Sequence, residues 1–136
     1  MKTMLEFTSD AFPAQPGEED EVNPGRHGRA LAEFVAAGLA AKGFRAGTPF
    51  AEDWGWQVDV ANEEFPLWIG CGNIEESANG FLVFVEPSRP FVRKWFRKIA
   101  TEPAVAPLAA ALHAVLADSG KVSGLTWVDT VGESLD

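Results

Sequence analysis

The spacing of hydrophobic and polar residues changes several times along the chain, and each change marks an expected element. Residues 3–8 form a short β-prone segment, which predicts a first strand. Hydrophobic and polar residues then alternate through residues 52–60, the period of two that is typical of a strand buried on one face. Segments 65–71 and 80–86 predict two further strands, with a hairpin turn at residues 62–64 before the first of them. Because these connections are too short for crossover helices, we expect an antiparallel meander.

Hydrophobic residues recur at helical spacing in three other segments. Residues 26–42 and 103–118 predict the two main helices, and each is followed closely by a glycine that suits a helix C-terminus. The shorter segment 91–99 has its apolar residues on one helical face and its basic residues on the other, so we expect a short helix with its aromatic residues facing the core. A last strand is expected at residues 122–130.

The expected order of the main elements is therefore β-α-β-β-β-α-β. Such an order is typical of an α+β fold, here with two layers: a mostly antiparallel sheet and two main helices packed on one of its faces. The sequence has no internal repeat or interdomain linker, so residues 1–136 are expected to form a single domain. Residues 9–25 contain the acidic run Glu18 to Glu21 and predict a long, solvated acidic loop. Residues 131–136 predict a mobile tail.

The composition is that of a soluble globular domain. The chain has 136 residues, of which 46% are hydrophobic and 23% are charged, and it is long enough to bury a core without a disulfide or a metal. Lys and Arg number 11 against 20 Asp and Glu, for a formal net charge of −9. This charge argues against a general nucleic-acid binder and against binding to anionic membrane surfaces. Because no segment has the length of a membrane-spanning helix and the N-terminus lacks the apolar run of a signal peptide, we expect a cytoplasmic location.

The charges are distributed unevenly along the chain. Residues 46–88 contain eight acids and no Lys or Arg, whereas residues 89–98 contain five of the 11 basic residues. The acids are Glu52, Asp53, Asp59, Glu63, Glu64, Glu75, Glu76 and Glu86. An acidic sheet surface would attract a basic protein partner, although acids also simply keep a protein soluble, and the basic segment could fold back on them. A nucleic-acid role for the basic segment is disfavoured because its aromatic residues are expected in the core.

The segment Glu52-Asp53-Trp54-Gly55-Trp56 is the least random part of the sequence. Residues two apart in a strand point to the same side, so we expect both indoles on one face. They could be core anchors, with Gly55 allowing a neighbouring backbone to approach and Glu52 or Asp53 accepting an indole N–H. Alternatively, they could floor a ligand pocket with the acidic pair at its mouth, or form a hot spot for a protein partner.

The motif and its surroundings resemble a group of small bacterial single-domain proteins that carry an EDWGW-type motif. The resemblance covers residues 26–85, with a helix followed by Pro49 to Trp56, a short strand and a hairpin, and it is specific only at the five motif residues. It implies a single-domain α+β protein of bacterial type, with no established activity and therefore no catalytic residue to carry over. Small bacterial domains of this size include immunity proteins that neutralise toxins, which is an analogy at the level of class.

Candidates for catalysis or metal binding are few. Cys71 is the single cysteine, which excludes an internal disulfide. As a nucleophile it would need His27 or His113 as a base, but it falls in the apolar register of its strand. Glu52 and Asp53 are adjacent in a strand and would point to opposite faces, so they are a poor acid–base pair. We expect no catalytic residue, no metal and no cofactor, because the spacing of zinc, calcium and phosphate-loop motifs is missing from the sequence.

Two functional hypotheses follow. The first is a non-enzymatic protein-binding domain, immunity-like or an adaptor, that binds a protein partner, a basic one by charge, through an acidic sheet surface. Its binding residues would be Glu52, Asp53, Trp54, Trp56, Asp59, Glu63 and Glu64. The alternative is a small-ligand or enzymatic pocket lined by Trp54, Trp56 and Glu52. His27 and Cys71 are further candidates for that pocket. A homodimer through the open face or an edge of the sheet is compatible with both, because an edge strand needs cover.

Overall fold

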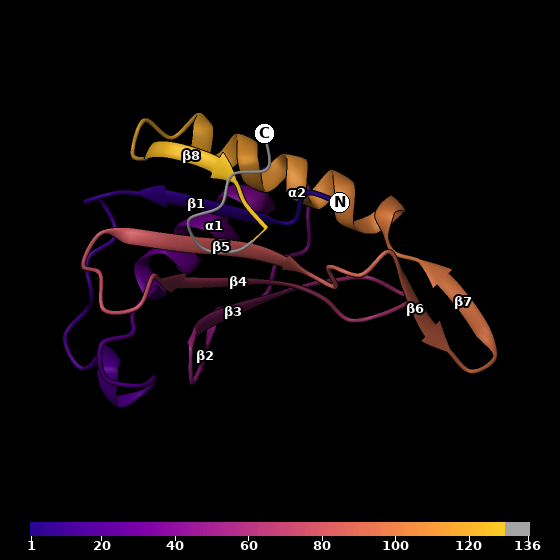
Figure 1. The fold of residues 1–136 in the computed structure, drawn as a ribbon, viewed down its shortest axis with the longest axis horizontal. Coiled ribbons are helices and arrows are strands. Elements are labelled where there is room, and N and C mark those ends of the chain that lie inside the picture. The colour runs from indigo at the N-terminus through magenta and orange to yellow at the C-terminus, as the bar shows by residue number, and fades with distance from the viewer. Residues whose placement is uncertain (130–136) are drawn as a thin grey trace.

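The computed structural model describes residues 1–129, in which helices pack on a sheet and a separate hairpin projects from one end (Figure 1). Within these residues, six strands form one antiparallel sheet in the order β2-β3-β4-β5-β1-β8. They are β1 (Met4–Thr8), β2 (Phe50–Glu52), β3 (Gly55–Val60), β4 (Leu67–Asn73), β5 (Gly80–Glu86) and β8 (Ser123–Trp127). The helices are α1 (Arg29–Ala41), α2 (Glu102–Ala117) and a short 3-10 helix at Glu18–Asp20. The predicted α+β class is confirmed.

Strands β3, β4 and β5 form the predicted meander, and the first strand of the chain lies beside it. Strand β1 pairs with β5 on one side and with β8 on the other, so that Leu5 lies opposite both Val83 and Trp127. The N-terminal strand is therefore an interior strand, and β8 lies beyond it at the edge of the sheet (Figure 1). At the other edge, β2 has only three residues. A short edge strand offers little backbone for pairing with other chains.

One face of the sheet and the two long helices enclose the core. Helix α1 packs against β3 and β4, and α2 packs against β5 and α1. The fully buried side chains include Leu5, Val58, Ile69 and Val83 from the sheet, Leu31, Val35 and Leu39 from α1, and Leu108, Leu112 and Leu116 from α2. Burying one such side chain contributes about 1.5–3 kcal/mol. Within residues 1–129, neither helix covers the opposite side of the sheet, which we call the open face.

The segment 91–99 is a β-hairpin, not the expected helix. Strands β6 (Phe91–Lys94) and β7 (Arg97–Ala100) pair with each other alone, and the turn between them consists of Trp95 and Phe96. These two side chains are 87% and 98% exposed, so the expectation that the aromatic residues face the core is wrong. The hairpin projects beyond the end of the sheet (Figure 1), and of its hydrophobic residues only Val92 and Ile99 pack against the core. These two contacts would not bury the apolar face of a helix, which depends on such packing for its stability.

Other boundaries differ in smaller ways. The strand expected at residues 52–60 is divided into β2 and β3, and the first long helix begins at Arg29 rather than at residue 26. The last strand ends at Trp127. The tail expected at residues 131–136 lies outside the described residues. None of the helices found in residues 1–129 has the length and apolar character needed to cross a membrane.

Candidate functional site

The EDWGW motif forms a tight turn rather than a continuous strand. Glu52 at the end of β2 pairs with Gly55 at the start of β3, so Asp53 and Trp54 alone make the turn. The indole of Trp56 is 3% exposed and belongs to the core, whereas that of Trp54 is half-buried on the open face. The expectation that both indoles share one face is therefore wrong, because Trp54 lies in the turn, where the alternation of a strand does not apply.

A carboxylate from the acidic loop anchors Trp56 on the core side. Glu18 is 1% exposed, and its Oε2 accepts a hydrogen bond from Nε1 of Trp56 at 2.8 Å. The same oxygen accepts the backbone N–H groups of Gly28 at 2.7 Å and Arg29 at 2.8 Å. Its Oε1 accepts the backbone N–H of Gln15 at 2.9 Å. Because Gly28 and Arg29 begin α1, Glu18 provides an acceptor and a negative charge to N–H groups that the helix itself leaves unpaired.

This arrangement corrects two expectations about the acidic residues. The run Glu18 to Glu21 is not wholly solvated, because the 3-10 helix turns Glu18 inward while Glu19 stays exposed. The acceptor of the indole N–H is Glu18, and both Glu52 and Asp53 are exposed. The acceptor lies 38 residues before the tryptophan in sequence, and this distant contact depends on the tertiary fold.

The hydrogen bonds to Glu18 also set its ionisation. Burial alone would raise the pKa of the carboxyl, because it disfavours the charged form. The backbone N–H groups of Gln15, Arg29 and Gly28 and the indole of Trp56 stabilise the carboxylate and outweigh burial. The pKa of Glu18 therefore lies below its ordinary value, and the residue is a charged structural anchor rather than a proton donor at neutral pH.

On the open face, three aromatic rings from different elements pack together. The ring centroids of Trp54 and Trp68 are 5.9 Å apart, and Phe84 lies 5.4 Å from Trp54 and 5.8 Å from Trp68. We call these three residues the aromatic cluster. Gly70 lies beneath it, because a Cβ there would be only 2.3 Å from Cζ of Phe84. All three rings are half-buried, so part of each faces outward.

A small apolar hollow adjoins the aromatic cluster. It encloses about 200 Å³ and is lined by Arg26, Gly72, Asn73 and Leu82 as well as the three rings. The guanidinium of Arg26 donates a hydrogen bond to the carbonyl of Asn73 at 3.3 Å. The buried amide of Asn73 donates to the carbonyl groups of Gly25 and Ser77, which fixes the loops at this rim. The hollow therefore combines flat apolar walls with a single guanidinium.

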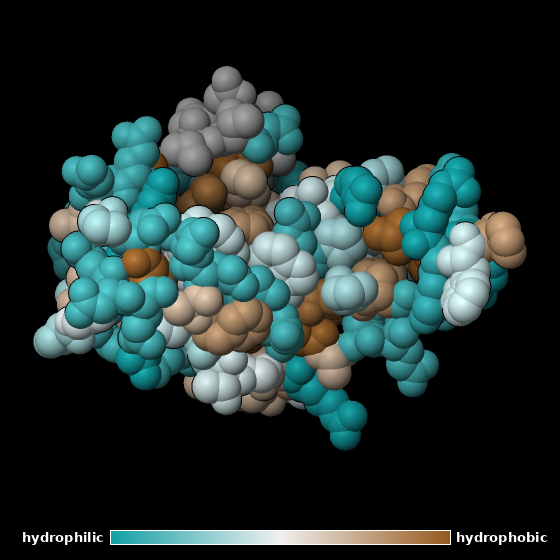
Figure 2. Space-filling model, turned by 90° about the horizontal axis from the view of Figure 1, so that it is seen from below, coloured by the Kyte–Doolittle hydropathy of each residue, from teal (hydrophilic) through white to brown (hydrophobic). Residues whose placement is uncertain are grey.

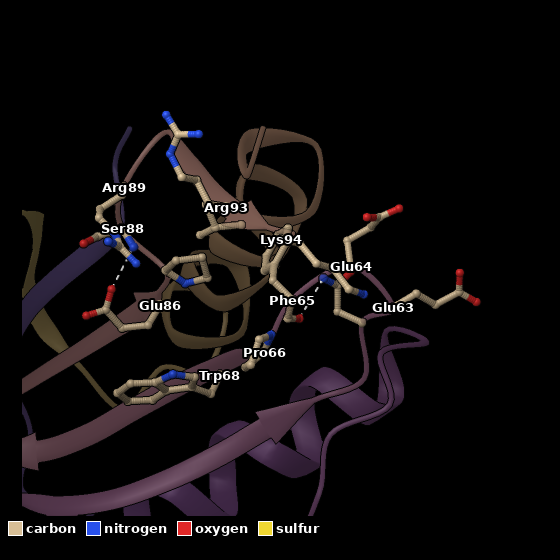
Figure 3. Close-up of a pocket in the computed structure, with 13 residues that line it drawn as sticks. Glu63, Glu64, Phe65, Pro66, Trp68, Glu86, Ser88, Arg89, Arg93 and Lys94 are labelled. Carbon is tan, nitrogen blue, oxygen red and sulfur yellow. Dashed lines mark hydrogen bonds between the residues drawn. The ribbon is translucent and has the colours of Figure 1, made fainter. Parts of the chain in front are cut away.

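A larger groove lies at the other end of the open face, between the β3–β4 turn and the hairpin (Figure 3). It encloses about 920 Å³, and Trp68 lines both this groove and the hollow. Its charged residues are Glu63, Glu64, Glu86, Arg89, Arg93 and Lys94. In Figure 3, Trp68 lies along one wall, Glu86 and Arg89 lie at one end, and Glu63 and Glu64 lie at the other. Seen from below, hydrophobic surface shows between hydrophilic areas toward the hairpin end of the molecule (Figure 2).

The expected acidic binding residues fall into separate groups. Asp59 and Glu86 lie on either side of Trp68 in the register of the sheet, so this part of the open face is acidic around one indole. Glu63 and Glu64 border the groove. Glu52 and Asp53 lie at the opposite end of β3 and do not line either cavity, and Trp56 is in the core.

His27 and Cys71 are buried on the core side and do not line the hollow or the groove. The ring of His27 meets the edge of Phe81 at 5.4 Å between centroids, and its Nε2 has no hydrogen-bond partner among residues 1–129. Burial raises the pKa of the Cys71 thiol far above its ordinary value, which disfavours the nucleophilic thiolate. His113 is half-buried on α2, and its ring stacks on the indole of Trp127.

We expect the Cys71 thiol to be inert in the native protein. A thiol reagent such as dithionitrobenzoate should modify it only as fast as the protein unfolds, because the sulfur is inaccessible and protonated. The measurement is the rate of modification with and without denaturant. Rapid modification of the native chain would show that Cys71 is accessible and would reopen its role as a nucleophile.

Comparison with protein-family models, with characterised proteins and with solved structures returned no match to this chain. In residues 1–129, no group of three His, Cys, Asp or Glu side chains is placed to hold a metal ion. The case for function therefore depends on the geometry of the open face.

Sequence reasoning missed Trp68, Phe84 and Arg26 as members of a site. The signal for the first two was present: segments 65–71 and 80–86 have large apolar residues at both odd and even positions. Both main helices were expected on one face of the sheet, so the second set of apolar residues had to lie on the open face. No comparable signal marks Arg26, whose position depends on the folding of the loop before α1.

Proposed function

We propose that the chain is a cytoplasmic, non-enzymatic protein-binding domain, immunity-like or an adaptor, whose binding surface is the open face. The observation that carries this proposal is the aromatic cluster, in which three half-exposed rings lie on a side of the sheet that neither described helix covers. Half-exposed tryptophan beside an apolar hollow is typical of the hot spots that dominate binding between proteins.

The charges around the cluster indicate the chemistry of the partner. Asp59 and Glu86 flank Trp68, and Glu63 and Glu64 border the groove on the side of the β3–β4 turn. The basic residues of the groove, Arg89, Arg93 and Lys94, belong to the hairpin side. A partner segment with basic residues around an apolar or aromatic side chain would complement both the acids beside Trp68 and the aromatic cluster. Complementary charge speeds association and excludes acidic competitors, while the apolar contact holds the complex together.

A small-ligand site is the second candidate, favoured by the apolar hollow with Arg26 at its rim. Of the residues expected to line a pocket, Trp54 alone lines this hollow, because Trp56 is in the core and Glu52 lies outside the lining. At about 200 Å³ it is smaller than the roughly 300–1,000 Å³ of most ligand sites. It would hold one ring-sized group, and one aromatic side chain of a protein partner has that size.

The central test is replacement of Trp68, which lines both cavities. We expect Trp68→Ala to weaken partner binding at least tenfold, which corresponds to about 1.4 kcal/mol. Tagged wild-type and variant chains are used to capture proteins from a soluble bacterial extract, the shared partner is purified, and its affinity is measured by calorimetry. Asp59→Lys is a second variant, because an exposed residue can be replaced without disturbing the core.

Glu19→Lys is the matched control, because it changes an exposed acid outside the open face by the same charge. It should leave binding unchanged, and circular dichroism should show all variants folded. If the two open-face variants bind every captured partner as well as wild type and Glu19→Lys do, the open face is not the binding surface.

A further inference from the structure

The turn of the β6–β7 hairpin presents two large aromatic side chains to solvent. Trp95 and Phe96 are 87% and 98% exposed, and neither lines the groove. Four basic residues flank them directly: Arg93, Lys94, Arg97 and Lys98. We call residues 93–98 the basic tip. Two adjacent exposed aromatic side chains form a contiguous apolar patch, and such patches mark interaction sites.

The backbone of the basic tip is shaped to present these rings. Trp95 has a φ of +59°, a conformation that glycine or asparagine usually provides in a two-residue turn. Holding a tryptophan there costs on the order of 1–3 kcal/mol, and such strained positions are typical of functional sites. Packing of the two rings on the described part of the chain does not offset this free-energy cost, since both are almost fully exposed.

The base of the hairpin is firmly attached. The buried Thr101 donates its backbone N–H to the carbonyl of Pro90 at 3.0 Å and its hydroxyl to the carbonyl of Arg89. Arg97 forms an ion pair with Glu64 of the β3–β4 turn at 3.3 Å. The basic tip is therefore a projecting element whose orientation is set before binding (Figure 1). A preformed element loses less conformational entropy when it docks.

We propose that the basic tip docks on the aromatic cluster of a second copy of this chain, and that two copies do so reciprocally to form a dimer. This proposal rests on the proposed function, because it names the occupant of the open face. The basic tip has the chemistry that the open face selects: one aromatic ring for the hollow, a second to pack beside it on the aromatic cluster, and cations for Asp59 and Glu86 beside Trp68.

The charge of the chain favours a second copy over other acidic partners. Residues 89–98 contain five of the 11 basic residues and none of the 20 acids. A nucleic acid or an anionic membrane that reached the basic tip would also approach the strongly acidic remainder of the molecule, which repels it. A second copy instead places its acidic face against the basic tip of the first.

The contact area is also sufficient. An aromatic side chain buries about 150–250 Å², so one docked tip buries on the order of 300–500 Å² and covers a similar area of the other copy. Two reciprocal contacts reach the roughly 1,200–2,000 Å² that stable protein interfaces bury.

Sedimentation equilibrium of the full chain, from micromolar to millimolar concentration, tests the proposal. We expect the wild type to dimerise and the double variant Trp95→Gly/Phe96→Ser to dimerise at least tenfold more weakly. Glycine suits the positive φ at residue 95, so this variant should melt at the same temperature as wild type or higher, and weaker dimerisation could not be due to unfolding. Trp68→Ala should weaken dimerisation as well, and higher salt should weaken it further.

The double variant and Trp68→Ala should form a mixed dimer when combined, because one intact tip then meets one intact face. A wild type that stays monomeric at every concentration would overturn the proposal, as would a dimer that the double variant leaves unchanged. Wild-type monomers that co-sediment with phosphatidylglycerol vesicles or with an oligodeoxythymidine would overturn it too. The proposed function would survive all three results if Trp68→Ala still weakened capture of another protein.

Discussion

Replacing Glu18 by Gln should lower the free energy of unfolding by about 2–4 kcal/mol. The carboxylate accepts hydrogen bonds from Gln15, Gly28, Arg29 and Trp56, and bonds to a charged acceptor contribute about 1.5–3 kcal/mol each. A glutamine keeps one acceptor oxygen but turns an NH₂ group toward the remaining N–H donors, so at least one buried donor loses its partner. Urea unfolding followed by tryptophan fluorescence measures the change, and Glu19→Gln, an exposed neighbour, should change almost nothing.

The effect of Glu18→Gln should depend on pH. Because the pKa of Glu18 is lowered on folding, its charge stabilises the folded state above the ordinary pKa of 4.5. That stabilisation is lost as the pH falls from about 4.5 through the folded pKa. The difference in stability between wild type and variant should therefore be full at neutral pH and shrink in acid. A difference that stays constant from neutral pH to below 4 would contradict the assigned role of the charge.

Replacing Gly55 by Ala should be at least as damaging, at about 3 kcal/mol or more. A Cβ at this position would lie 2.5 Å from the carbonyl oxygen of Cys71, a backbone atom that cannot move without disturbing the β3–β4 pairing. The φ of +154° at Gly55 is also one that other residues rarely adopt. Thermal unfolding should show a large decrease in the melting temperature. The aromatic cluster should be disturbed as well, because Trp54 is the residue before Gly55.

Gly47→Ala is a matched control for this substitution. A Cβ at residue 47 would meet its nearest atom, the carbonyl oxygen of Asp59, at 3.6 Å, which is ordinary van der Waals contact. The control should therefore melt close to wild type. If Gly55→Ala melts there too, the close approach of β3 to the Cys71 carbonyl is not a constraint on the fold.

The sheet and its helices could be predicted because the hydrophobic pattern of each segment fits only one type of secondary structure. The period of two before Val60 and the helical spacing of Leu31, Val35 and Leu39 each leave a single face to bury. Short connections then force an antiparallel meander. What the pattern could not show is that β1 lies between β5 and β8, because register between distant strands depends on the complete core.

The hairpin and the site were harder to predict. The apolar residues Phe91, Val92, Trp95, Phe96 and Ile99 fit a helical face, and they fit equally a hairpin that exposes its turn. Only the surroundings decide between the two, since a helix here would need a surface to pack on. Likewise, two tryptophans two residues apart imply one shared face only if both lie in a strand, and Trp54 lies in a turn.

The position of β1 has a consequence for the order in which the sheet can be completed during synthesis. Leu5 emerges from the ribosome long before Trp127, which is one of its two neighbours across the sheet. Until β8 has been made, one edge of β1 exposes unpaired N–H and C=O groups to any other strand. Contacts between residues so distant in sequence also slow folding, because a long loop must close first. Nascent or truncated chains that stop before Ser123 should therefore aggregate through β1, and a chaperone would have its greatest effect on them.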